Sequence, residues 1–433
     1  MKKKGIISLL ACGAMAVSAT LGMTACGGDK GGSLTVWAAS DEIPTLTKMI
    51  QAFKEENPDF GLDIKTGITG TGDALTNIST DPSAGADVYC YANDQLVDLI
   101  NYQALSPIPE ATVNQLKIDN YENSVNAGYH NGKYYGYPYA ADNGYFLFYN
   151  KAVVSDTQAQ TLEGILSACA RAGKYFIYNM EEAWYVGTFF LGTGEGCVGG
   201  TYTIEYENTT VSSAYTNFNE KAAGQDTYTI AQVGAQAMID LVEDYKSVCF
   251  MSGDDDTIAQ YLTGDKSGTM FGACISGTWN AKIMSEKLGE NYGATKLPTF
   301  HSSLTDTDYQ MGSLSGYKLY GVNPNTKYTA KAHQLAAFLT GEEMQELRFD
   351  ELQTGPSNLK VAALDKVKQD IAQAAVAAQA PFATLQGCYT DSYWNPMKQL
   401  GADIYGAKEI KGSITSDSMA AKLKLFVDNF IVG

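Results

Sequence analysis

Residues 33–67, SLTVWAASDEIPTLTKMIQAFKEENPDFGLDIKTG, decide the fold class of this chain. Apolar residues alternate at the start of the stretch, which predicts a strand, and Leu62 to Lys65 predict another strand at its end. Between them apolar residues recur at helical spacing until Asn57-Pro58 ends the helix, at Leu46, Met49, Ile50 and Phe53. A strand, a helix and a strand in this order predict a parallel pair.

The same alternation continues outward along the chain. A helix near residues 73–80 and a strand at 87–91 complete a βαβαβ run, which predicts a largely parallel sheet. After a hairpin turn at Asn131-Gly132 and before a nearly all-helical end, helices alternate with strands at 145–149, 175–178, 269–275 and 314–322. At 433 residues the chain is too long for one ordinary core, so we expect an α/β protein of two lobes.

The composition excludes several kinds of partner. Lys and Arg number 30 and Asp and Glu 48, and because three of the lysines precede Cys26, residues 26–433 carry a formal charge of −21. Such a surface repels nucleic acid and anionic lipid. Only Arg171 and Arg348 are arginines, so we expect no bidentate clamp for phosphate or carboxylate. The 28 tyrosines, 16 phenylalanines and 4 tryptophans suit a neutral ligand with apolar faces and hydroxyl edges.

Residues 1–25 have the pattern of a secretory leader, with three lysines, an uncharged apolar run and small residues before Cys26. Leu21 to Cys26 resembles the bacterial lipobox, in which the cysteine is lipidated and becomes the mature N-terminus. Residues 26–32 then form a flexible, glycine-rich tether. We expect a protein anchored by lipid on the extracytoplasmic face of the bacterial cell membrane. A retained membrane helix and cleavage to a free protein are the alternatives.

The chain carries few marks of an enzyme or a metal site. It has three widely separated histidines and no HExxH, P-loop or GxSxG motif, so we expect no cofactor and no metal. Asp254-Asp255-Asp256 lacks the spacing of a calcium loop, and we expect a solvated helix start there. Beyond the leader and Cys26, six cysteines lie without metal-binding spacing, at Cys90, Cys169, Cys197, Cys249, Cys274 and Cys388. We expect buried free thiols, while a disulfide among them stays open.

Several short segments occur together in the order and approximate spacing of one known family. They are Gly32 to Trp37, Gly85 to Asp94, Tyr129 to Lys133 with Tyr137-Pro138, Tyr149 to Lys151, Asn179 to Trp184, Gly277 to Trp279, Tyr292-Gly293 with Leu297 to Phe300, and Tyr393-Trp394. From Ser33 to Gly433 the chain resembles the maltose/maltodextrin-binding proteins of bacterial ABC importers. The resemblance implies a hinged, two-lobed periplasmic-binding-protein fold with two doubly wound sheets, crossing strands and C-terminal helices. It implies a first lobe of residues 33–143 and 293–340 and a second lobe of 144–292 and 341–433.

The family's ligand contacts carry over to this chain residue by residue. Its sugar-stacking aromatics fall on Tyr91, Trp184, Trp279 and Trp394. Its hydroxyl-binding acids fall on Asp41, Asp94, Glu182 and either Asp142 or Asn143. Two basic residues of the family are replaced by Glu42 and Gln95, which leaves ligand length and preference open. Trp37, at the end of the first strand, is expected in the core or just behind the site.

The residue types agree with this resemblance on physical grounds. A glucose ring has apolar C–H faces and a rim of hydroxyls, so aromatic rings bind its faces and carboxylates accept its hydrogen bonds. We therefore expect a monomeric, lipid-anchored solute-binding protein, not an enzyme, that captures α-linked gluco-oligosaccharides and delivers them to ABC permease subunits. The alternatives are a binding protein for another neutral oligosaccharide, such as β-glucan or xylan fragments, and a surface glycoside hydrolase, which needs two carboxylates flanking the bond.

Overall fold

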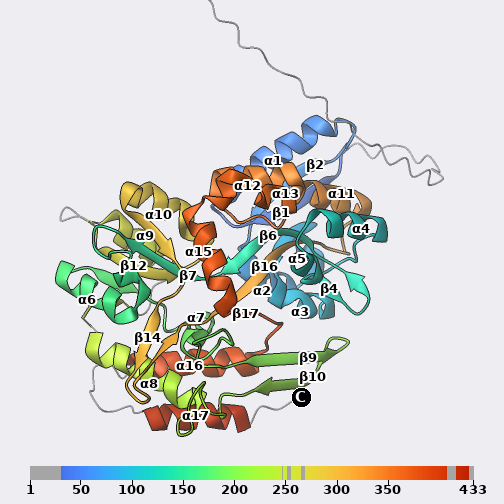
Figure 1. Ribbon diagram of the computed structural model, residues 1–433. Helices are drawn as coiled ribbons and strands as arrows, with labels where there is room; N and C mark the ends of the chain where they lie inside the picture. The colour runs from blue at the N-terminus through green and yellow to red at the C-terminus, as the bar shows by residue number, and fades with distance from the viewer. Residues whose placement is uncertain (1–30, 246, 251–254, 265–268, 407–415, 429–433) are drawn as a thin grey trace, which may run out of the picture.

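The computed structural model describes residues 31–245, 247–250, 255–264, 269–406 and 416–428 of the 433-residue chain. These residues form two α/β lobes that lie against each other (Figure 1). The expected leader, Cys26, nearly all of the tether and Asp254 lie outside the described residues, so those expectations stay predictions. Within the described ranges, no helix combines the length and the apolar character that crossing a membrane requires.

The first lobe is built on a sheet whose N-terminal strands are parallel. Its order is β2 (Asp63–Ile68), β1 (Ser33–Ala38), β3 (Val88–Ala92), β16 (Ser313–Val322) and β17 (Ala383–Leu385). β1 pairs in parallel with β2 and β3, which confirms the predicted βαβαβ run, while β16 runs antiparallel to β3. Helix α1 (Ile43–Glu56) buries its predicted apolar stripe and packs against α11 (Thr329–Leu339) and α12 (Glu342–Leu352).

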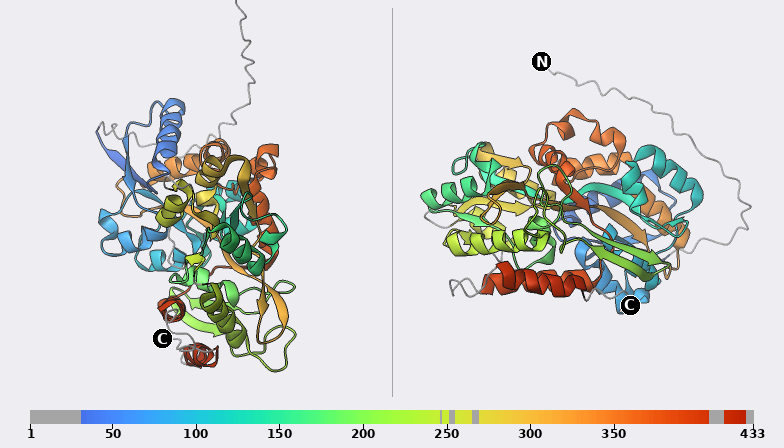
Figure 2. Two further views of the ribbon diagram at one scale, coloured as in Figure 1. Left: turned by 90° about the vertical axis from the view of Figure 1, so that its left-hand side faces the viewer. Right: turned by 60° about the horizontal axis from the view of Figure 1, so that its bottom comes forward.

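The second lobe is built on a separate sheet of mixed direction. Its order is β11 (Cys249–Phe250), β8 (Tyr175–Ile177), β12 (Phe271–Ser276), β7 (Phe146–Asn150) and β13 (Tyr292–Thr295). β8 is parallel to β11 and β12, and β7 is antiparallel to β12 and β13. Helices α6 (Leu162–Ala172) and α9 (Asp255–Thr263) pack on β12. Figure 2 shows α17 (Ser416–Asp428) along the outer side of this lobe, where it packs on α8 (Ile230–Tyr245) and α16 (Asp391–Gly406).

Helix α6 shows how the local sequence sets the bounds of an element. The Gly164 amide donates to Thr161 Oγ1 at 3.1 Å, which satisfies one of the unpaired amides at the helix start. Gly173, at φ 63°, ends the helix in a conformation that glycine adopts without steric cost. The residues predicted for the apolar face are all buried, namely Leu162, Ile165, Leu166 and Cys169.

The chain crosses between the lobes several times. Strand β6 (Tyr137–Gly144) pairs with β16 in the first sheet and continues through Tyr145 into β7 of the second. The return path runs from β13 to β16 through a hairpin of β14 (Thr299–Ser302) and β15 (Thr307–Gln310). Helix α15 (Ile371–Gln379) packs on β13 and lies across the junction of the lobes in Figure 1. Lobes joined by such strands can close by hinge bending.

Several elements depart from the expected lobe boundaries, among them β17, which lies beyond residue 340 but pairs with β16 in the first sheet. Residues 293–340 were expected in the first lobe, but β13 pairs with β7 in the second sheet. Residues 341–433 were expected in the second lobe, but α12 packs on α1, and its Met344 lies in the core of the first lobe. Strand pairing and core packing, rather than position along the chain, decide which lobe these elements join.

The predicted hairpin turn at Asn131-Gly132 is confirmed. It joins β4 (Tyr129–His130) to β5 (Lys133–Tyr134), and its two central residues have φ angles of 46° and 79°. Positive φ at both positions is what a type I′ turn requires, and asparagine and glycine adopt it readily.

A second hairpin, formed by β9 (Tyr202–Glu207) and β10 (Thr210–Thr216), was not predicted. It extends from the second lobe, and its tip reaches the first lobe. There the Asn131 side-chain amide donates to Asn208 Oδ1 at 3.3 Å, and the Thr209 hydroxyl donates to Asn101 Oδ1 at 3.2 Å. His130 Nε2 also hydrogen-bonds the Asn208 carbonyl. The hairpin therefore ties the lobes together by contacts at its tip.

The six described cysteines are all free thiols, as expected. Five are buried, and Cys388 is half-buried. Burial raises the pKa of Cys90 to about 11 and that of Cys388 to about 12, so these thiols stay protonated and unreactive near neutral pH. Trp37 packs at the edge of a first-lobe core cluster, 6.2 Å from the Tyr89 ring, as expected.

Candidate functional site

A cavity of about 340 Å³ lies between the two lobes. Asp41 and Glu42, just before α1, line it from the first lobe together with Lys318 of β16. Trp279 and helix α10 (Ala281–Leu288) line it from the second lobe. Asp41 follows the end of β1, and Trp279 follows the end of β12. The cavity thus lies at the carboxyl ends of strands, where open α/β sheets commonly bind ligands.

Two tryptophans pack against each other at this cavity, and Trp279 is the one that lines it. The ring centroid of Trp279 lies 5.6 Å from that of Trp184, and the ring planes are inclined by 36°. Trp184, in the short helix α7 (Ala183–Val186), is held in turn by the ring of Tyr145 at 4.9 Å. Gly277 makes room for this arrangement, because a Cβ atom there would collide with the Trp279 ring. From the first lobe, Lys318 Nζ lies 5.4 Å from the Trp279 ring centroid.

The charged side chains that line the cavity balance one another. Three are lysines and three are carboxylates, namely Lys282, Lys287, Lys318, Asp41, Glu42 and Glu286. Because neither sign is in excess, the cavity suits a neutral polar ligand better than an ion. Among the residues that the structure describes, no cluster of three or more His, Cys, Asp or Glu side chains offers a metal site.

A buried ion pair fixes Glu42 at the cavity. Glu42 Oε1 lies 3.6 Å from Arg348 Nη1, and the two side chains are only 10% and 2% exposed. The Arg348 guanidinium lies 4.3 Å from the Tyr139 ring centroid and donates to the Tyr320 hydroxyl at 3.3 Å. One of the chain's two arginines is therefore engaged inside the first lobe. Sequence reasoning missed this pair because α1 and α12 are distant along the chain.

Asp94 and Gln386 meet Trp184 at the junction of the lobes. Trp184 Nε1 donates to Gln386 Oε1 at 2.9 Å. Burial raises the pKa of Asp94 to about 6, and Asp98 raises it further, whereas hydrogen bonds from its own backbone amide and from the Gln386 side chain oppose the increase. Gln386 thus joins Asp94 of the first lobe to Trp184 of the second. No sequence pattern marked Gln386 as part of the site.

The sequence matches the family model of bacterial extracellular solute-binding proteins over residues 48–375. The chain belongs to this family. In this solute-binding protein, both lobes contribute side chains to the interlobe cavity described above. Comparison with curated proteins finds no significant match.

Solved structures share the fold over nearly the whole chain. One, solved with acarbose, is 26% identical with a TM-score of 0.75 and covers 92% of this chain and 97% of its own. Maltodextrin binding protein MalE1 from L. casei BL23, without ligand, is 21% identical with a TM-score of 0.68, covering 92% and 98%. The maltose-maltodextrin binding protein of Alicyclobacillus acidocaldarius is 19% identical with a TM-score of 0.70, covering 92% and 100%. This likeness confirms the expected two-lobed fold.

The structure of this solute-binding protein brings only part of the expected ligand set to the cavity. Asp41 and Trp279 line it, and Trp184 packs on Trp279. Tyr91, expected to stack on a sugar, is instead completely buried in the first lobe, next to Gly136. All five residues of β3 are buried, so the Tyr91 ring has no free face for a ligand.

Two other expected residues, Trp394 and Glu182, do not line this cavity. Trp394 lies on α16, where its Nε1 donates to the Tyr389 carbonyl at 2.9 Å and its ring centroid lies 5.7 Å from that of Tyr389. Glu182 is exposed at the residue before α7. Trp394 therefore contacts the protein's own chain with both its edge and its ring.

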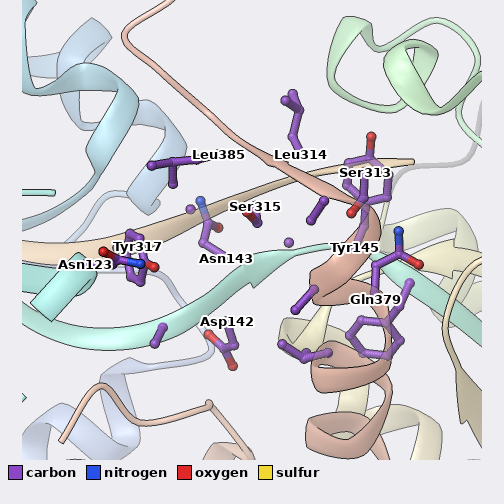
Figure 3. Close-up of a pocket in the computed structure, with 17 residues that line it drawn as sticks. Asn123, Asp142, Asn143, Tyr145, Ser313, Leu314, Ser315, Tyr317, Gln379 and Leu385 are labelled. Atoms are coloured by element: carbon purple, nitrogen blue, oxygen red, sulfur yellow. The ribbon is translucent and has the colours of Figure 1, made fainter. Parts of the chain in front are cut away.

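Asp142 and Asn143 line a different cavity, of about 310 Å³, between the crossing strands and α15 (Figure 3). Figure 3 shows Tyr317 at one end of this cavity and Gln379 at the other. The Asp142 carboxylate is 2% exposed and accepts a hydrogen bond from the Gly355 amide. Of the two expected alternatives, neither lines the cavity with Trp279.

Proposed function

We propose that this solute-binding protein captures neutral, α-linked gluco-oligosaccharides of the maltodextrin type and delivers them to the permease subunits of an ABC importer. The observation that carries the proposal is the indole of Trp279, backed by Trp184, which lines the interlobe cavity together with the carboxylate of Asp41. Aromatic rings bind the apolar faces of sugars, and carboxylates accept hydrogen bonds from sugar hydroxyls. The balanced charge of the cavity favours a neutral ligand of this kind.

The similar structures support the same class of ligand. One was solved with acarbose, and two others are named as maltodextrin-binding proteins. The cavity of about 340 Å³ lies at the small end of the usual range for small-molecule sites, about 300 to 1,000 Å³. A short oligosaccharide therefore suits it.

Capture requires a ligand that contacts both lobes. Lys318 of the first sheet and Trp279 of the second lobe face each other at the cavity. A sugar that contacts both lobes binds the closed arrangement better than the open one, and this difference in affinity is what shifts the equilibrium toward closure. A dissociation constant of about 1 μM, equivalent to about −8 kcal/mol, is sufficient for such a receptor.

We further propose that the mature protein begins at a lipidated Cys26 and acts as a monomer on the extracytoplasmic face of the cell membrane. The leader of residues 1–25, the lipobox-like run before Cys26 and the glycine-rich residues 26–32 support this. Membership of an extracellular family agrees with it. Two or more acyl chains give stable anchoring, whereas one gives only reversible binding.

Calorimetric titration with a panel of neutral trisaccharides tests the proposal. We expect saturable binding of maltotriose and none of cellotriose or xylotriose at the same concentrations. Binding of cellotriose or xylotriose with no response to maltotriose would replace the α-glucan assignment by one of the alternative sugars. Chromatography of the same samples after several hours tests for hydrolysis, because a binding protein leaves every sugar intact, whereas a glycoside hydrolase releases shorter products.

A further inference from the structure

The segment from Gln386 to Tyr389 runs between the lobes and is tied to the first lobe by its backbone. The Gln386 amide donates to the Ser315 carbonyl at 2.8 Å, and the Gln386 carbonyl accepts from Asn93 Nδ2 at 2.9 Å. Cys388 Sγ donates to the Asn93 carbonyl at 3.4 Å. These bonds hold the segment directly against Asn93 and the neighbouring Asp94.

The second lobe holds the same segment from the other side. Trp184 Nε1 donates to Gln386 Oε1 at 2.9 Å, and Trp394 Nε1 donates to the Tyr389 carbonyl at 2.9 Å. The Tyr206 hydroxyl, on β9, hydrogen-bonds the Cys388 carbonyl. Both tryptophans thus donate a hydrogen bond to this segment through the indole N–H group.

This packing separates residues that the resemblance assigned to one ligand site. Gln386 is only 5% exposed, and one oxygen of Asp94 is buried without a hydrogen-bond partner. The space between Asp94 and the two tryptophans, Trp184 and Trp394, is therefore occupied by the protein's own chain. Trp279 lines the cavity beside Asp41, Trp184 packs on Trp279, and Gln386 engages the edge of Trp184 that faces away along the junction of the lobes.

We propose that Gln386 is a specificity-determining residue that limits the length of the bound sugar by closing the site at Trp184. The inference rests on the proposed function and adds a chain-length limit to it. In this arrangement a disaccharide fills the cavity between Asp41 and Trp279. Additional sugar units meet the Gln386 side chain instead of Asp94 and Trp394, so they add no contacts.

The test is a calorimetric series with glucose, maltose, maltotriose and maltotetraose on the full protein. For the wild type we expect affinity to rise from glucose to maltose and then to change by less than about threefold, equivalent to about 0.7 kcal/mol. Gln386→Ala shortens the barrier, so the affinity for maltotriose relative to maltose is expected to increase by about fivefold or more, equivalent to about 1 kcal/mol. Gln399→Ala, on the exposed face of α16, is the matched control and should leave this ratio unchanged.

The ratio of affinities separates a role in specificity from a structural one. If Gln386 only stabilises the junction of the lobes, its removal lowers the affinities for maltose and maltotriose by the same factor, and the proposal is overturned. The wild type alone can also overturn the proposal. This happens if its affinity rises about tenfold with each added glucose unit, from glucose through maltotetraose. Absence of binding by every sugar of the series would instead refute the proposed function itself, and the length limit with it.

Discussion

Trp184 and Trp279 lie with ring centroids 5.6 Å apart, although each follows a different strand of the second sheet. The parallel pairing of β8 with β12 brings their carboxyl ends together and so places the two indoles side by side. Gln386 engages the edge of Trp184, and Lys318 approaches the face of Trp279. This ring pair therefore connects the second sheet with Lys318 of the first sheet and with Gln386, which is hydrogen-bonded to that sheet.

Trp279→Ala is expected to weaken sugar binding by about 2 to 4 kcal/mol, in the range of binding-site aromatics that are truncated. The free energy of unfolding should change little, because the Trp279 side chain is half-buried at the cavity. Calorimetric titration and thermal melting measure the two effects. Trp37→Ala is the control, since this half-buried ring packs beside a core cluster of the first lobe and does not line the cavity, so its loss should lower stability with affinity retained. A large loss of stability with full affinity in Trp279→Ala would assign Trp279 to the core.

The buried carboxyl of Asp94 is expected to make stability depend on pH. Its pKa is raised from the ordinary 3.8 to about 6, so between these values the folded protein binds more protons than the unfolded chain. Stability must therefore fall as pH rises through this window, and the loss is complete above it. Asp94→Asn should abolish this dependence and raise the free energy of unfolding near pH 7 by about 1 to 3 kcal/mol.

Urea unfolding at pH values on both sides of the Asp94 titration measures this effect. Asp59→Asn, at an exposed position, is the control and should behave like the wild type. A wild-type protein and an Asp94→Asn variant with the same dependence of stability on pH would show that Asp94 is solvated rather than covered by Gln386.

Arg348→Met should destabilise the first lobe by about 3 to 5 kcal/mol, because it leaves the Glu42 carboxylate buried without its partner. Adding Glu42→Gln to this variant should recover most of the loss. Lys366→Ala, which removes an exposed lysine paired with Glu346 and Asp350, is the control and should cost less than about 1 kcal/mol. Denaturant unfolding measures the free energy of unfolding of all three variants. Similar losses of stability in Arg348→Met and Lys366→Ala would contradict a role for the buried ion pair.

Asn208→Gly is expected to speed sugar release without altering the cavity. The substitution keeps the turn, because Asn208 has φ 57° and glycine adopts positive φ readily, but it removes the contact with Asn131. We expect dissociation about two- to fivefold faster in stopped-flow fluorescence, the size of one lost hydrogen bond of about 0.5 to 1 kcal/mol. Unchanged release would mean that the hairpin tip does not stabilise the closed lobes.

Cys26→Ala should abolish lipid attachment and leave the protein either unprocessed or released from cells. The small residues before Cys26 and the glycines after it are the basis for this prediction. Incorporation of labelled fatty acid and partitioning into detergent measure the effect. A variant that still carries the label would place lipidation elsewhere or exclude it.

The fold was largely predictable because apolar periodicity reports which face of an element is buried. Leu46, Met49, Ile50 and Phe53 identified α1 correctly, and Asn131-Gly132 identified a turn that needs positive φ. The β9–β10 hairpin was missed because its turn has no glycine after Asn208, and because its outward residues are polar and exposed. The alternation of Tyr202, Ile204 and Tyr206 was the signal that marks its inner face.

The site was harder to predict than the fold. Tryptophans are few and suit sugar faces, so Trp279 and Trp184 stood out in the sequence. Tyr91 did not follow this rule, because β3 is buried on both faces and an aromatic there packs in the core. Gln386 follows a short edge strand, and its role depends on contacts with Asn93 and Trp184 that are distant in the sequence. No local pattern encodes such contacts.

A crystal structure of the protein with maltose bound would show directly whether the sugar lies against Trp279 and Asp41. We predict a sugar ring stacked on the Trp279 indole, with hydroxyls hydrogen-bonded to Asp41, inside the cavity between the lobes. We also predict that the Trp184 Nε1 to Gln386 Oε1 hydrogen bond persists in the complex. Maltose bound instead in the cavity beside Asn143, or lying between Asp94 and Trp394 with Gln386 displaced, would contradict the account.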